Sequence, residues 1–255
     1  MNKISGAFAG KKAFIAYIMA GDPNLSVSAQ YILAAQEAGA DMIEIGIPFS
    51  DPVAEGEVVE AAHMRSLHAG TRLDGIFEML ASIKDQMRTP MAFATYLNPV
   101  FVYGYDSFFA RCVDVGVCAV IIPDMPFEEQ GEAKEAAGRH GVEIITLIAP
   151  TSGERISKIA RQAQGFIYLI PPMDTDGDGS AALTAMVAEI KKAADIPVAI
   201  DCGTCSPQQA RRLLASADSI IVGSSIASIV QQHGENARQP LYEHIKELKK
   251  DMMQP

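Results

Sequence analysis

Apolar runs alternate with amphipathic runs of helical period along the whole chain. Apolar runs rich in β-branched residues predict eight strands, at residues 13–19, 42–47, 91–96, 119–123, 143–148, 166–170, 198–201 and 219–222. Apolar residues recurring at helical spacing predict helices between and after these strands, at residues 26–38, 57–68, 73–86, 105–115, 127–140, 154–163, 181–194, 207–215, 225–233 and 241–252. Strands that alternate with crossover helices form a parallel sheet.

The number of strands predicts how that sheet closes. Eight parallel strands make a (β/α)8 barrel, and the 255 residues of the chain match the usual length of about 250. A doubly wound open sheet is the alternative, but it carries a glycine-rich turn after its first strand, and Gly21-Asp22-Pro23 is not such a turn. No linker or composition break divides the chain. We therefore expect an α/β fold, one (β/α)8 TIM barrel domain over residues 1–255.

Composition and charge narrow the class of protein. Hydrophobic residues make up 49% of the chain, which allows a large core. The net charge of −10 disfavours nucleic acid and anionic membranes as partners. No apolar run is long enough to cross a bilayer, and residues 1–12 lack the apolar core of a signal peptide. We expect a cytoplasmic protein with neither nucleic-acid nor membrane partners.

Cysteines and histidines give little support to redox or zinc chemistry. Four cysteines do not make a disulfide scaffold, and we expect Cys112 and Cys118 to pack as small hydrophobic residues. Cys202 and Cys205 stand between a strand and a helix, as a thioredoxin-like dithiol does, which leaves a redox role open. Zinc would need four ligands, and the other two cysteines lie in a different βα unit. The five histidines fall on helical stretches, where solvated helix faces explain them.

Glu44 stands inside the second predicted strand, where an ionised carboxylate needs a partner. One interpretation is an ion pair with a buried base, although no Lys or Arg lies within ten residues on either side. The other is a carboxylate at the floor of a pocket, with its pKa raised by burial so that it can act as a general acid. Barrel active sites lie at the C-terminal ends of the strands, which favours the second interpretation.

Residues 221–226, Ile-Val-Gly-Ser-Ser-Ile, predict a strand, a turn of small residues and a helix start. Barrels often bind phosphate at such a helix N-terminus, after strands seven and eight. An ordinary βα turn with a serine N-cap is the alternative. Gly203 favours phosphate, whereas Asp201 and the acidic loop at 174–178 oppose it. Residues 174–179 match the first half of a calcium loop, but Ala185 occupies the twelfth position, where a bidentate Glu is needed, so a solvated polar loop is favoured.

With these units in place, the chain resembles the α subunit of tryptophan synthase. The most specific matching segment is residues 43–52, Ile-Glu-Ile-Gly-Ile-Pro-Phe-Ser-Asp-Pro, around strand two. Others along the chain are Ala20-Gly21-Asp22-Pro23, Arg65-Ser66-Leu67, Tyr96-Leu97-Asn98-Pro99, Tyr103-Gly104, residues 122–129 and Gly223-Ser224. The resemblance implies a lyase that cleaves indole-3-glycerol phosphate to indole and glyceraldehyde 3-phosphate, with neither a metal nor an organic cofactor.

The resemblance also implies residue roles and a partner. Glu44 matches the family's general acid, which protonates C3 of the indole ring, and Glu55 matches a second carboxylate that receives the indole N–H. The implied substrate-binding residues are Tyr17, Tyr96, Tyr168, Asp176, Gly177, Cys202, Gly203, Gly223 and Ser224. The family's partner is a pyridoxal-phosphate β subunit, in a heterotetramer, and the loop 50–56 and the turns at 98–99 and Pro126 match surfaces that contact it. No lysine lies near a strand C-terminus, which disfavours a Schiff-base aldolase.

The active-site loops depart from the family's pattern, while the scaffold residues match. Glu55 replaces an Asp, Asp176 aligns with a Thr of a mobile loop, Asp201-Cys202-Gly203 replaces Gly-Phe-Gly, and Met19 replaces a Thr. Two alternatives therefore stay open. One is a diverged relative that cleaves another small molecule and depends less on phosphate. The other is a non-catalytic partner subunit, in which the pocket could be collapsed or filled.

Overall fold

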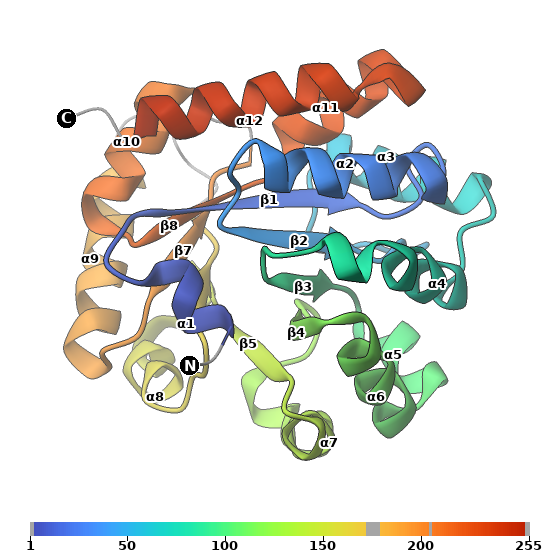
Figure 1. Ribbon diagram of the computed structural model, residues 1–255. Helices are drawn as coiled ribbons and strands as arrows, with labels where there is room; N and C mark the ends of the chain where they lie inside the picture. Colours follow the sequence, from blue (N-terminus) through green and yellow to red (C-terminus); the bar gives the residue numbers. More distant parts are fainter. Residues whose placement is uncertain (1–2, 172–178, 204–205, 253–255) are drawn as a thin grey trace.

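The computed structural model describes residues 3–171, 179–203 and 206–252, and they form a closed barrel of parallel strands (Figure 1). The strands are β1 (Ala13–Met19), β2 (Met42–Gly46), β3 (Met91–Ala94), β4 (Val117–Ile121), β5 (Glu143–Ile148), β6 (Ile167–Leu169), β7 (Val198–Asp201) and β8 (Ser219–Val222). Each strand pairs with its neighbours in sequence order, and β8 pairs with β1 to close the ring. The predicted (β/α)8 barrel is confirmed, and the open sheet is excluded.

Strand register explains how Glu44 reaches the barrel interior. Tyr17 of β1 pairs with Glu44 of β2, and Glu44 pairs in turn with Ala92 of β3. Neighbouring residues on a strand point to opposite faces, so Ile43 and Ile45 pack outward against the helices while Glu44 points inward. The strand could therefore be recognised by its apolar outer face, while its inner face carries the polar group.

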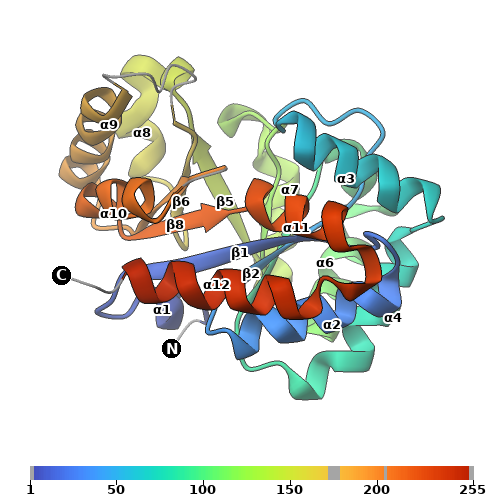
Figure 2. The ribbon, with the colours of Figure 1, turned by 90° about the horizontal axis from the view of Figure 1, so that it is seen from above.

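The helices surround the barrel, except that the first one packs against its floor (Figure 1). They are α1 (Lys3–Phe8), α2 (Leu25–Glu37), α3 (Glu57–His68), α4 (Leu73–Ile83), α5 (Leu97–Tyr103), α6 (Tyr105–Val115), α7 (Gly131–His140), α8 (Ile156–Ala160), α9 (Gly179–Ala193), α10 (Pro207–Ser216), α11 (Ser224–His233) and α12 (Arg238–Met252). The last helix, α12, lies beside α2 and completes the ring (Figure 2). Within the described ranges, no helix is both long and apolar enough to traverse a bilayer.

Three predicted helices are shorter in the structure than in the sequence analysis. The stretch 73–86 divides into α4 and a 3-10 turn at Lys84–Gln86, and 127–140 divides into a 3-10 turn at Phe127–Glu129 and α7. The third, 154–163, shrinks to α8, because residues 154–155 belong to a 3-10 segment that is interrupted at Gly153, with φ of 48°, and the helix already ends at Ala160. The helical pattern of apolar residues thus continues into short 3-10 segments, because residues three apart lie on the same face in a 3-10 helix as well.

Two helices were missed in the sequence analysis. Helix α1 carries Ile4 and Phe8 at helical spacing, and both are buried at the floor of the barrel, where the Phe8 ring lies 5.3 Å from that of Phe166. Helix α5 begins directly after the third strand, so Asn98 and Pro99 lie in a helix and not in the predicted turn. A proline is compatible with the first turn of a helix, because that turn needs no N–H from it.

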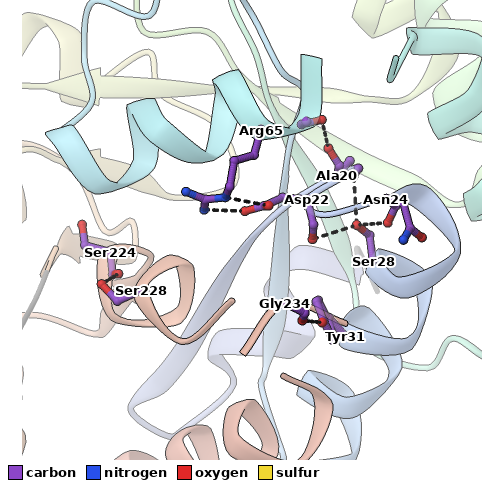
Figure 3. Close-up of polar contacts among 11 residues, drawn as sticks. Ala20, Asp22, Asn24, Ser28, Tyr31, Arg65, Ser224, Ser228 and Gly234 are labelled. Atoms are coloured by element: carbon purple, nitrogen blue, oxygen red, sulfur yellow. Dashed lines mark hydrogen bonds and ion pairs between the residues drawn. The ribbon is translucent and has the colours of Figure 1, made fainter. Parts of the chain in front are cut away.

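The loop after β1 is fastened to the helix that follows the Glu55 loop. Asp22, 2% exposed, accepts two hydrogen bonds from Arg65 of α3, from Nε at 2.9 Å and Nη2 at 2.7 Å (Figure 3). The Ser28 hydroxyl accepts the N–H of Gly21, and the Ser66 hydroxyl donates to the carbonyl of Ala20. These buried contacts hold β1, which carries Tyr17, against α3.

Candidate active site

A cavity of about 360 Å³ opens at the C-terminal ends of the strands. Its polar lining consists of three carboxylates, two tyrosines and the turns after β7 and β8, contributed by Tyr17, Glu44, Glu55, Tyr168, Asp201, Cys202, Gly203, Gly223 and Ser224. Apolar side chains such as Val59, Ile121 and Leu147 complete the wall. The volume lies within the range of small-molecule sites, about 300–1,000 Å³. The cavity is neither collapsed nor filled, which argues against a purely non-catalytic subunit.

Glu44 is a buried acid at the floor of this cavity. It is 2% exposed, and its Oε2 atom has no hydrogen-bond partner. None of the described residues that line the cavity is a lysine, an arginine or a histidine, so the interpretation as a buried ion pair is wrong. Burial raises the pKa of Glu44 well above its usual value, and the charges of Asp201 and Glu55 raise it further. A raised pKa favours the protonated form of this carboxyl, which is the form that a general acid needs.

Glu55 faces the same cavity from the loop between β2 and α3, and it is half-buried. Burial, together with the charge of Asp201, raises its pKa to about 7, against the opposing effect of a hydrogen bond with Tyr96. Glu55 therefore titrates near neutral pH, and the pKa of Glu44 is raised as well. Two carboxyl groups in one cavity, both with raised pKa values, are candidates for acid–base catalysis.

Tyr96 and His63 fix the loop that carries Glu55. The Tyr96 hydroxyl accepts the N–H of Ala54 at 3.3 Å, and its ring stacks on Phe49 with centroids 5.2 Å apart. His63 Nδ1 accepts the N–H of Phe49 at 3.0 Å. Tyr96 does not line the cavity itself, so its contacts are with the loop.

His63 corrects the prediction that the histidines occupy solvated helix faces. It does lie on a helix, α3, but it is only 2% exposed, and burial lowers its pKa to about 4. The ring is therefore neutral at pH 7. Nδ1 acts as an acceptor, so the hydrogen is on Nε2, which is buried without a partner.

Tyr17 and Tyr168 are protonated donors inside the cavity. The Tyr17 hydroxyl lies against Gly46, where an added Cβ would come within 2.7 Å of the Tyr17 Cζ atom, and the ring also packs on Gly223. The Tyr168 hydroxyl donates to Asp201 Oδ2 at 3.2 Å. Burial, followed by the nearby carboxylates, raises the pKa of both tyrosines well above the usual value.

The turns after β7 and β8 meet at one end of the cavity. An added Cβ at Gly203 would lie 3.9 Å from Ser224 Oγ, so the two turns are neighbours. Helix α11 begins at Ser224 with Gly223 as its N-cap and no side-chain cap, so the alternative of a turn with a serine N-cap is not what the structure has. Ser228 donates to the Ser224 carbonyl, one turn along the helix (Figure 3). The first N–H groups of α11 are thus left without a side-chain cap beside the cavity.

The structure brings together most of the predicted site residues. Glu44, Glu55, Tyr17, Tyr168, Cys202, Gly203, Gly223 and Ser224 line one cavity, and Tyr96 lies behind the Glu55 loop. Asp176, Gly177 and Cys205 lie outside the described residues, as does the loop at 174–178 that matches half of a calcium site. Across the described ranges, no group of three or more His, Cys, Asp or Glu side chains could hold a metal ion. Cys112 is buried as predicted, and Cys118 is half-buried.

The closed barrel, with paired carboxylates in the cavity at its C-terminal end, defines a (β/α)8 enzyme suited to acid–base catalysis. A family model described as tryptophan synthase alpha chain matches residues 7–254, and the chain belongs to this family. The family consists of lyases of tryptophan biosynthesis, which cleave indole-3-glycerol phosphate to indole and glyceraldehyde 3-phosphate.

Relatives and solved structures agree with this assignment. The tryptophan synthase alpha chain of Lacticaseibacillus casei is 40% identical over 252 residues, covering 98% of this chain and 95% of that protein. The corresponding chain of Petrotoga mobilis is 38% identical, with 99% of each covered. Among solved structures, the alpha subunit from Legionella pneumophila str. Paris superposes with a TM-score of 0.91 at 29% identity, covering 99% of this chain and 98% of that one. A chain of the tryptophan synthase complex from Pyrococcus furiosus gives 0.86, also at 29% identity, covering 94% and 98%.

Proposed function

We propose that this chain cleaves indole-3-glycerol phosphate with Glu44 as general acid and Glu55 as the second carboxylate. The observation that carries the proposal is the buried, unpaired Oε2 of Glu44 in an open cavity that contains no basic side chain among its described lining. Protonation at carbon needs an acid that holds its proton and is shielded from water. The raised pKa of Glu44 supports that role.

The reaction takes two proton transfers. Glu44 gives its proton to C3 of the indole ring, forming an indolenine whose ring nitrogen carries the positive charge. The Glu44 carboxylate then removes the proton from the glycerol hydroxyl on the carbon attached to C3. That carbon becomes the aldehyde, the C–C bond breaks, and its electron pair returns to the ring to give indole. Glu44 ends protonated, ready for the next turnover.

Glu55 stabilises the intermediate in this scheme. A carboxylate that accepts the indole N–H becomes more favourable as the ring nitrogen gains positive charge, so its effect is greatest along the reaction path. Tyr96 supports this role, because it makes a hydrogen bond with the Glu55 side chain and its hydroxyl accepts the N–H of Ala54 next to Glu55. A pKa of about 7 means that Glu55 becomes a carboxylate within the physiological range.

The phosphate group is assigned to the end of the cavity at Gly203, Gly223 and Ser224. The backbone N–H groups at the start of α11 have no side-chain cap and could bind an anion, and the helix dipole favours negative charge there. The remaining predicted contacts, Tyr17, Tyr168 and Cys202, line the walls on which the ring and the glycerol would lie. Asp176 and Gly177 stay predictions from the family resemblance.

The partner is a pyridoxal-phosphate β subunit, in keeping with a family that forms complexes with such subunits. Large apolar side chains stand exposed on the segments that follow β2 and β3, with Val53 at 77%, Phe101 at 64% and Val102 at 76%. Val53 belongs to the Glu55 loop, and the other two belong to α5. Exposed large apolar side chains on segments that follow the C-terminal ends of two neighbouring strands support an interaction surface there.

The test is to incubate the chain with indole-3-glycerol phosphate, alone and with a β subunit, and to measure indole. We expect indole in both cases and more with the β subunit. Glu44→Gln keeps the shape of the side chain and should abolish most of the activity. If no indole forms, either alone or with the β subunit present, the proposed function is rejected. A fully active Glu44→Gln variant rejects the mechanism.

A further inference from the structure

Asp201 places a carboxylate at the end of the cavity assigned to phosphate. It is the last residue of β7 and pairs in register with Ile221 of β8, two residues before Gly223. It lines the cavity together with Gly203 and Ser224. The negative charge therefore lies in the same cavity as the catalytic carboxyl groups and in direct contact with the turn at Gly203, one of the turns that would hold an anion.

The contacts of Asp201 use up donors of the site. Its Oδ1 accepts the backbone N–H of Gly203 at 2.9 Å, and its Oδ2 accepts the Tyr168 hydroxyl at 3.2 Å. Both partners are donors, so the arrangement suits the ionised carboxylate. The N–H of Gly203 belongs to the turn after strand seven, where barrels present backbone donors to phosphate. In this chain the protein itself occupies that donor.

Nothing in the described lining compensates for this charge. Glu44, Glu55 and Asp201 share the cavity, and no lysine, arginine or histidine side chain lines it. A phosphate placed at the start of α11 would meet a nearby like charge in surroundings of lowered dielectric, where the repulsion is stronger than in water. Among the described residues at this end of the cavity, the donors left for it are the first N–H groups of α11 and the Ser224 hydroxyl.

We propose that Asp201 is a specificity-determining residue that makes cleavage by this chain depend weakly on the phosphate of its substrate. The chain would then accept 3-substituted indoles whose side chain ends in a neutral hydroxyl, as well as the phosphate ester. This inference rests on the proposed lyase function, because it concerns the same cavity and the same bond cleavage.

The experiment compares kcat/KM for indole-3-glycerol phosphate with kcat/KM for the unphosphorylated indole-3-glycerol, and takes their ratio as the phosphate preference. Asp201→Asn removes the charge and keeps an oxygen that can accept the N–H of Gly203. Asp201→Gly removes the charge and also frees that N–H. Glu135→Gln, at a surface residue with a 79% exposed side chain, is the matched control for net charge.

We expect the phosphate preference to rise about tenfold in Asp201→Asn, which corresponds to 1.4 kcal/mol, and further in Asp201→Gly. Glu135→Gln should leave it unchanged. Inorganic phosphate should also inhibit Asp201→Gly at lower concentration than the wild type, a readout that does not depend on turnover of the second substrate. Thermal unfolding identifies any variant that has lost its fold.

A phosphate preference that is unchanged in both folded variants, with unchanged inhibition by inorganic phosphate, overturns the role of Asp201 and leaves the lyase function intact. Cleavage of neither substrate by the wild type or by Asp201→Gly rejects the proposed function itself. In that case the role of Asp201 is tested by binding of inorganic phosphate alone. Phosphate should raise the unfolding temperature of Asp201→Gly more than that of the wild type, and an equal rise in both proteins would show that Asp201 does not oppose anions.

Discussion

His63 accepts the backbone N–H of Phe49 through Nδ1 at 3.0 Å, and this contact fastens the start of the loop that carries Glu55. The imidazole is almost completely buried, and the Phe49 ring stacks on Tyr96 next to it. A histidine on α3 thus positions a catalytic loop without entering the cavity. Its role is structural support of the site, through one backbone hydrogen bond and close packing.

Removal of this support should cost both stability and rate. His63→Ala leaves a buried N–H at Phe49 without its acceptor and opens a cavity, which should lower the free energy of unfolding by about 2–4 kcal/mol. Loosening of the loop should lower kcat/KM about tenfold or more, since small misplacements of catalytic groups are costly. His63→Asn, whose Oδ1 can take the place of Nδ1, should recover part of both losses. Denaturant unfolding and initial-rate kinetics provide the measurements, and equal defects in the two variants would contradict the hydrogen-bonding role.

The lowered pKa of His63 predicts a loss of stability in acid. Its pKa is about 4 in the folded chain and about 6.5 when unfolded. The unfolded chain therefore binds the proton more readily, so this contribution is complete above pH 6.5 and is lost as the pH falls toward 4. The raised pKa values of Glu44 and Glu55 act in the opposite direction, because those groups favour the folded state at low pH. The comparison must therefore be made between variants.

The difference in unfolding free energy between the wild type and His63→Asn isolates the histidine. Between pH 6.5 and pH 4 the wild type should lose up to about 1.4 kcal/mol more per pH unit than the variant. Urea titrations at half-unit steps of pH would reveal the slope. Parallel stability curves for the two proteins would show that the imidazole is not held neutral.

Much of the architecture could be predicted from the order of apolar runs. The outward faces of the strands carry β-branched residues such as Ile43 and Ile45, and eight repeats leave few topologies for a parallel sheet. Glu44 could be recognised because a charge inside an apolar strand conflicts with its surroundings. Such conflicts between local pattern and residue type are typical of functional sites.

Other features depend on contacts between elements far apart in sequence. The spacing of apolar residues predicted that His63 lies on a helix. The face of α3 that carries His63 is buried because the loop at Phe49 packs against it, and this contact cannot be read from the helix alone. Asp201 could be placed near a phosphate site, whereas its hydrogen bonds to Tyr168 and Gly203 depend on strand register. Helix α1 had a detectable signal in the spacing of Ile4 and Phe8, which was outweighed by the polar residues around them.

Glu55 should govern the acidic side of the pH–rate profile. As an acceptor for the indole N–H it must be ionised, so kcat/KM should rise with pH through an inflection near 7. Glu44 must be protonated and has a pKa raised well above the usual value, so activity should fall again at higher pH. Glu55→Gln should remove the rising limb near 7 and lower the plateau. The substrate phosphate titrates near pH 6 in both proteins, so a limb that persists in the variant would belong to the substrate.

Gly46 should not tolerate even a methyl group. A Cβ there would lie 2.7 Å from the Tyr17 Cζ atom and would overlap the hydroxyl, so the ring would have to leave its position beside Glu44. Gly46→Ala should therefore lower kcat/KM by more than about tenfold and destabilise the barrel by about 1–3 kcal/mol. Gly138→Ala on α7, where nothing lies within 4 Å of the added Cβ, is the control. It should be neutral or slightly stabilising, and equal effects of the two substitutions would exclude the steric explanation.

The ion pair between Asp22 and Arg65 should be essential for the fold on the β1 side of the site. Asp22 has a 3% exposed side chain and accepts two hydrogen bonds from the guanidinium, so removal of one partner leaves a buried charge without compensation. Arg65→Met should lower the free energy of unfolding by about 3–5 kcal/mol. Asp22→Asn with Arg65→Met removes both charges, and the double variant should be more stable than Arg65→Met alone.

A double-mutant cycle on unfolding free energies tests the coupling between Asp22 and Arg65. Arg139→Met, at an exposed ion pair, is the control and should change the free energy of unfolding by less than about 1 kcal/mol. If Arg65→Met is no more harmful than this control, the loop after β1 is held by its backbone and by Ser66, and not by the ion pair.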